Sequence, residues 1–185
     1  MLRRLIHRYI TAKVKRSYGY DAAYMHALAD ASPTTFAKFA VVASLVDRRA
    51  APPEALAAAG IVATLAEDCG PCAQISVDLA LKGGARPGAI RAVLAGDESA
   101  MGEEAALGYR FARSVMERRL SEADEWRDEI VRRWGEKGLI AISLSLTTAR
   151  MYPTLKYAMG YGKTCSKLIV AGEPAPFEKP VPLAA

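Results

Sequence analysis

The sequence Cys69-Gly70-Pro71-Cys72 fixes the start of one helix, and the rest of the fold has to be built around that point. Proline is tolerated at the first positions of a helix, because its missing N–H has no partner there and its φ angle is already helical. The glycine before it can supply the break in the chain. We therefore expect Cys69 just outside a helix and Cys72 in the first turn of that helix.

Two thiols at this spacing are close enough to form a disulfide with little movement of the backbone. The pair Cys69 and Cys72 can then cycle between dithiol and disulfide. The alternative is a metal site, but structural zinc takes four ligands, and the chain otherwise offers only Cys165, His7 and His26 besides its carboxylates. We expect redox chemistry with no metal and no bound cofactor.

The chain has 185 residues, of which 51% are hydrophobic, which predicts a single domain with a buried core. Three cysteines are too few for a disulfide scaffold, and the N-terminus does not have the pattern of a signal peptide. This indicates a cytoplasmic protein. The longest apolar run, residues 138–149, is short of the roughly 20 residues that a membrane span needs, so no integral membrane contact is expected.

Glycine and proline divide the chain into a succession of helices, with no convincing strand, so the expected fold class is all-α. The expected helices span residues 21–31, 33–46, 55–66, 71–83, 87–95, 100–119, 121–134 and 139–159. The last is the most apolar and is expected to be central to the core, with Pro153 kinking or breaking it. We expect a helical domain over residues 21–170 and a proline-rich, extended tail over residues 171–185.

Residues 1–20 form an expected amphipathic helix with six basic residues and no acid. Such a helix can bind an anionic membrane surface or nucleic acid, or direct a protein to an organelle. No aromatic or glycine-rich nucleic-acid motif accompanies it, so no nucleic-acid partner is expected. We favour packing of this helix on its own domain or on a partner subunit.

Five segments in a fixed order carry a resemblance to a known family. They are the apolar helix 55–66, the Cys69-Gly70-Pro71-Cys72 motif, Leu79 to Ala85, Ile90 to Asp97, and Ala105 to Tyr109. Together they resemble the carboxymuconolactone decarboxylase and alkylhydroperoxidase (AhpD-like) proteins, over roughly residues 35 to 165. The resemblance implies a small all-helical domain that forms homo-oligomers. In the alkylhydroperoxidase branch it implies a thiol pair that reduces peroxides and is recycled by a dithiol electron donor.

The chain departs from the family at its proton relay. The family pattern has a glutamate and a histidine at positions that are Ala57 and Ser76 here. Ser76 lies one helical turn from Cys72 and can hydrogen-bond a sulfur, but a hydroxyl is not a general base near neutral pH. Glu67 is the candidate replacement for the carboxylate, and the alternative is an exposed acid near a helix end. The candidate site is thus Cys69, Cys72, Ser76 and Glu67.

The local sequence does little to ionise a thiol. A helix N-terminus favours a thiolate by about 0.3–1 kcal/mol, while Glu67 and Asp68 beside Cys69 oppose it by repulsion. Rapid peroxide reduction therefore needs a basic group from elsewhere in the fold. The histidines, His7 and His26, are the obvious candidates, and without such a group we expect slow peroxidase or disulfide-exchange activity.

The expected function is that of a thiol oxidoreductase that reduces a small peroxide or exchanges disulfides through Cys69 and Cys72. The alternative is a helical binding or structural member of the family that has lost the chemistry, which the missing relay favours. Nothing in the sequence indicates the lactone-acid pocket of the decarboxylase branch. We expect Cys69 to attack, because it lies outside the helix and is more accessible, and Cys72 to resolve. The family pattern gives the attacking role to the second cysteine.

Overall fold

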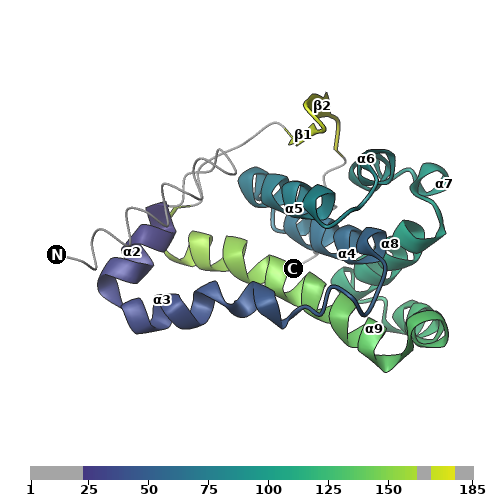
Figure 1. The fold of residues 1–185 in the computed structure, drawn as a ribbon, viewed down its shortest axis with the longest axis horizontal. Helices are drawn as coiled ribbons and strands as arrows, with labels where there is room; N and C mark the ends of the chain where they lie inside the picture. Colours follow the sequence, from purple (N-terminus) through teal and green to yellow (C-terminus); the bar gives the residue numbers. More distant parts are fainter. Residues whose placement is uncertain (1–22, 162–167, 178–185) are drawn as a thin grey trace.

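The computed structural model describes residues 23–161 and 168–177, and these are mostly helical (Figure 1). The elements are α2 (Ala23–Ala31), α3 (Pro33–Ala40), the 3-10 helix η1 (Val42–Leu45), α4 (Pro53–Ala66), α5 (Gly70–Lys82), α6 (Pro87–Ala95), α7 (Glu98–Met101), α8 (Glu103–Met116), α9 (Leu120–Ala158), β1 (Leu168–Val170) and β2 (Glu173–Ala175). The predicted all-α class is confirmed. None of the helices in the described ranges combines the length and apolar character needed to cross a bilayer.

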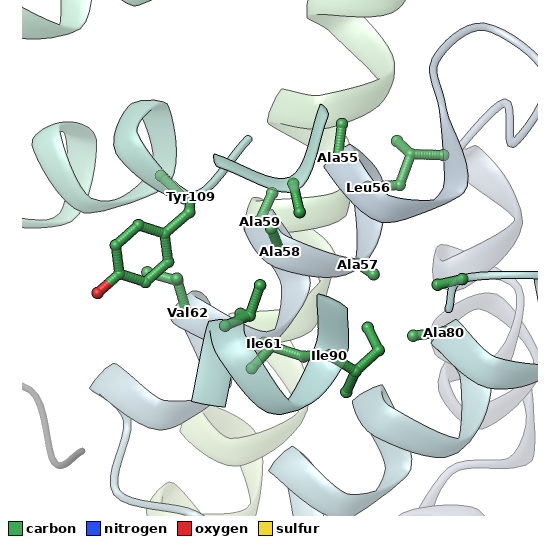
Figure 2. Close-up of a cluster of buried hydrophobic side chains, with 14 of the residues drawn as sticks. Ala55, Leu56, Ala57, Ala58, Ala59, Ile61, Val62, Ala80, Ile90 and Tyr109 are labelled. Atoms are coloured by element: carbon green, nitrogen blue, oxygen red, sulfur yellow. The ribbon is translucent and has the colours of Figure 1, made fainter. Parts of the chain in front are cut away.

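Helix α4 is the centre of the core. Every residue from Glu54 to Thr64 is buried, and α5, α6, α8 and α9 all pack against this helix. Figure 2 shows side chains of α4, among them Ile61 and Val62, in one buried cluster with Ile90 of α6 and Tyr109 of α8. The expectation that residues 139–159 are central was only partly right, since α9 packs on α4 but leaves Ile140 exposed. Small residues let α4 approach several neighbours closely at once.

Helix α9 is interrupted where the sequence predicts it. Gly135 has non-helical angles (φ 67°, ψ 179°) inside the span from Leu120 to Ala158. A left-handed φ of this kind favours glycine. Pro153 does not break the helix, which continues past it to Ala158, and a kink at this residue stays a prediction. The Pro153 ring is fully buried, and its packing offsets the hydrogen bond that proline cannot form.

Helices α2 and α3, with η1, form an arm on one side of the bundle (Figure 1). Ser32 caps α3, as predicted, by accepting a hydrogen bond from the backbone N–H of Thr35. The arm is attached to the bundle by η1 against α9, by the buried Tyr24, and by an edge-on contact between the rings of Phe39 and Tyr152. The single helix predicted over residues 33–46 is divided into α3 and η1.

A short antiparallel hairpin, β1 with β2, contradicts the expectation of no strand. Its turn residues Ala171 and Gly172 both have positive φ, as the tightest hairpin turns require. Gln74 on α5 anchors the hairpin, since its side chain donates to the carbonyl of Ile169 (2.9 Å) and accepts from the N–H of Ile169 (2.7 Å). The first part of the expected tail, residues 171–177, thus belongs to a segment that packs on α5 of the same chain. The rest of the expected tail and the N-terminal helix 1–20 lie outside the described residues.

Candidate functional site

The cysteine motif lies where α4, α5 and α9 meet. Helix α5 begins at Gly70, with Cys69 as its N-cap and Cys72 in its first turn, as predicted. The turn between α4 and α5 holds Asp68 in a left-handed conformation (φ 49°), which a residue other than glycine seldom adopts. The carbonyl of Asp68 accepts a hydrogen bond of 2.8 Å from the hydroxyl of Tyr157 on α9. Helix α9 therefore holds the turn that presents the thiols.

Both cysteines are free thiols and both are buried, with 2% of Cys69 and 5% of Cys72 exposed. The expectation that Cys69 is the more accessible of the two is wrong. The cause is α9, whose residues Lys156 and Tyr157 lie against Cys69. Accessibility therefore gives no reason to prefer Cys69 as the attacking thiol.

The cysteine motif itself supplies no basic group. Helix α9 places one beside Cys69. The amine Nζ of Lys156 donates a long hydrogen bond to Sγ of Cys69, at 3.9 Å, and only 4% of Lys156 is exposed. Lysine is almost never fully buried unless it is paired. Cys69, one of its partners, lies 87 residues earlier in the chain, so neither spacing nor a motif indicates this residue.

These surroundings lower the pKa of Cys69 from 9.0 to about 6. The largest cause is the hydrogen bond from the thiol of Cys72, and the backbone N–H of Cys72 adds a second. Burial opposes them by disfavouring the charged form, while the charge of Lys156 and the hydroxyl of Tyr157 favour it. Cys69 is therefore largely a thiolate at pH 7, although the local sequence alone leaves it close to an ordinary thiol.

Glu67 is neither exposed nor isolated. Its carboxylate forms an ion pair with Arg150 on α9 (2.6 Å), and the side chain is 16% exposed. The hydroxyl of Thr154 lies 3.5 Å from the second carboxylate oxygen. The positive charge of Arg150 weakens the repulsion that Glu67 was expected to exert on a thiolate at Cys69. A part for Glu67 in proton transfer stays a prediction.

Cys72 and Ser76 face a cavity of about 420 Å³, whose wall is formed by the arm, α4, α5 and α9. Cys72 reaches this cavity although little of it is exposed, whereas Cys69 does not belong to its wall. The two sulfurs therefore have different environments, one beside Lys156 and the other beside the cavity. The structure brings Ser76 and Cys72 to the same surface, as the one-turn spacing predicts.

Within residues 23–161 and 168–177, no group of three His, Cys, Asp or Glu side chains is arranged to hold a metal ion. His26 lies on α2, while His7 and Cys165 are outside the described ranges. The histidines were considered as the basic group beside the thiol, but the cationic group that the described part of the chain places beside Cys69 is Lys156.

No family model, no curated protein and no solved structure matches this chain. The resemblance to the AhpD-like family therefore rests on the sequence segments quoted above, and a function has to be argued from the site itself.

Proposed function

We propose that this protein is a thiol oxidoreductase that works in a reducing compartment such as the cytoplasm. It reduces peroxides or exchanges disulfides through Cys69 and Cys72. The observation that carries the proposal is the buried amine of Lys156 at 3.9 Å from Sγ of Cys69. Burying an ammonium group costs several kcal/mol, and an apolar side chain of similar size would stabilise the fold as well or better. A role in ionising the thiol explains why a lysine is present there.

In the peroxide reaction, the thiolate of Cys69 attacks one peroxide oxygen, so that an S–O bond forms and the O–O bond breaks. The leaving oxygen takes a proton and departs as an alcohol or water, and Cys69 becomes a sulfenic acid. The thiol of Cys72, already hydrogen-bonded to Cys69, then attacks that sulfur, which forms the disulfide and releases water. Two electrons have passed from the thiol pair to the peroxide.

A dithiol donor returns the pair to its reduced state. Its first thiolate attacks Cys72, the sulfur that borders the cavity, and Cys69 leaves as the thiolate. A thiol with a low pKa is the better leaving group, so the pKa of about 6 favours this direction of attack. The donor's second thiol then attacks the donor sulfur of this mixed disulfide and displaces Cys72. The donor leaves as a disulfide, having given two electrons to the thiol pair.

The alternative is a binding or structural protein that keeps the fold without the chemistry. It is favoured by the near-complete burial of both sulfurs and by Ala57 and Ser76 at the relay positions. The low pKa of Cys69 weighs against it, because an inert buried thiol has no need of a charged partner.

Thiol titration of the purified protein before and after stoichiometric peroxide distinguishes the oxidoreductase from the binding or structural protein. We expect both thiols of the pair to be lost and to return with a small dithiol reductant, with the Cys69–Cys72 disulfide identified by mass spectrometry. The variant with both cysteines replaced by serine is the control for Cys165. Persistence of both thiols under peroxide would support the structural alternative.

A further inference from the structure

The cavity beside Cys72 has the properties of a small-molecule site. Its volume of about 420 Å³ lies within the roughly 300–1,000 Å³ of typical ligand pockets. Its wall combines the arm (α2, α3 and η1) with α4, α5 and α9, so it is a space between elements that is partly open to solvent. A molecule inside it would touch Cys72.

Most of this wall is effectively apolar. Phe36 and Ile75 contribute hydrophobic side chains. The hydroxyls of Thr64, Ser145 and Thr148 also face this region, but each already donates to a backbone carbonyl, at 3.1, 2.8 and 2.7 Å. A hydroxyl whose donor is used in this way offers a ligand an acceptor only, and the remaining hydroxyls of the wall belong to Tyr24, Ser76 and Tyr152. The interior therefore suits a hydrocarbon chain.

Arg48 is the one charged residue among those that line the cavity in the described part of the chain. It follows η1 and is exposed, and its guanidinium has no partner among the residues that the structure describes. The carboxylate of its neighbour Asp47 accepts instead from the backbone N–H of Arg49 (3.1 Å). A guanidinium presents a planar set of donors that matches a carboxylate.

We infer that this cavity binds an amphipathic carboxylic acid, with the carboxylate at Arg48 and the apolar chain in the interior beside Cys72. One positive charge at the edge of an apolar space selects an anion with a hydrophobic body over a neutral or cationic molecule of the same shape. That such an acid also carries a hydroperoxide or a dithiol that reacts with the thiol pair rests on the proposed function. The binding of the acid does not rest on it.

The test uses the reduced, full-length protein titrated by calorimetry with decanoate, decanol and decylamine. We expect decanoate to bind most tightly and to protect Cys72 from alkylation by iodoacetamide, followed on its own peptide by mass spectrometry. Arg48→Gln should weaken decanoate binding about ten-fold, the effect of losing a charge-assisted hydrogen bond, and leave decanol binding unchanged. Arg49→Gln is the matched control, because Arg49 is exposed beside Arg48 but does not line the cavity.

The inference is overturned if decanoate does not bind, if decylamine or decanol binds as tightly as decanoate, or if the two arginine variants weaken decanoate equally. Turnover is not needed for any of these results. A protein that binds decanoate but fails the peroxide titration contradicts the proposed function alone. A protein that cycles its thiols but ignores decanoate contradicts this inference alone.

Discussion

At the scale of single residues, the charge on Cys69 depends on partners from two distant parts of the chain. Cys72 belongs to the same helix start, while Lys156 and Tyr157 come from the last turns of α9. Each partner stabilises the thiolate more than the thiol, so removing any one of them should raise the pKa of Cys69. The contributions can be separated by changing one partner at a time.

The first prediction concerns pH. The thiolate ultraviolet absorbance of the wild-type protein should appear with a midpoint near the pKa of about 6 and be lost below it. Cys72→Ala should move the midpoint upward more than Cys72→Ser, because a serine hydroxyl still donates to the sulfur. Lys156→Met should also move it upward. A wild-type midpoint near the ordinary value of 9.0 would show that the partners do not act on Cys69.

The second prediction concerns redox potential. Lys156 stabilises the thiolate and therefore the reduced pair, while a disulfide carries no charge for it to stabilise. Lys156→Met should make the disulfide harder to reduce, by tens of millivolts, since about 30 mV corresponds to about 1.4 kcal/mol for this couple. Equilibration with glutathione measures it, and Lys137→Met, an exposed change on the same helix, is the control. A higher potential in Lys156→Met would contradict the role given to this amine.

The third prediction is which sulfur attacks. After peroxide treatment, the Cys72→Ser protein should carry a sulfenic acid or mixed disulfide on Cys69, detectable by mass spectrometry. The Cys69→Ser protein should react slowly, because the groups that lower the pKa of Cys69, namely the Cys72 donors and the charge of Lys156, act on the position that has been replaced. The reverse order of rates would assign the attack to Cys72, the sulfur that borders the cavity.

At the scale of elements, the packing of α8 against α4 depends on one glycine. A Cβ added at Gly108 would lie 2.9 Å from the Cα of Ala55, which is backbone and cannot move aside cheaply. The fourth prediction is that Gly108→Ala lowers the free energy of unfolding by about 1–3 kcal/mol through overpacking. Gly88→Ala on α6 is the control, because nothing lies within 4 Å of its added Cβ, so its stability should be unchanged or slightly higher. Equal thermal midpoints for the two variants would contradict the close approach.

The elements that could be predicted from the sequence are those set by local signals. Helices α4 and α6 follow the proline starts and apolar runs that mark them, and Cys69 lies at the predicted helix start. The hairpin could not be predicted in this way, because its strands are three residues long and it is held by Gln74 on a distant helix. Lys156 was missed for the same reason, since its burial depends on how α9 packs over Cys69.

At the scale of the whole molecule, several large apolar side chains remain outside the core. Val41, Leu45, Leu120 and Ile140 are each more than half exposed, at 59%, 58%, 64% and 55%. Single exposed hydrophobic residues are ordinary, but Val41 directly precedes the short helix η1 and Leu45 is its last residue. The homo-oligomer that the family resemblance implies stays a prediction.

The fifth prediction is therefore that the protein is a dimer or larger at micromolar concentration, measured by light scattering. Leu45→Glu should weaken the assembly if η1 is part of the interface, because a charge would be buried against the partner. Arg49→Glu, an exposed change a few residues along, is the control. A monomeric mass for the wild-type protein would contradict this prediction.

The arm is attached to the bundle by few contacts, and this determines which part of the molecule opens locally. Its helices α2 and α3 pack chiefly on each other and reach the bundle through η1, Tyr24 and Phe39, while α4 is enclosed on all sides. Segments with few buried contacts open locally at a small fraction of the free energy of global unfolding, and their amide hydrogens exchange first. We therefore expect the amides of α2 and α3 to exchange while those of α4 stay protected. Access to Cys72 through the cavity would then depend on local opening of the arm and not on unfolding of the core.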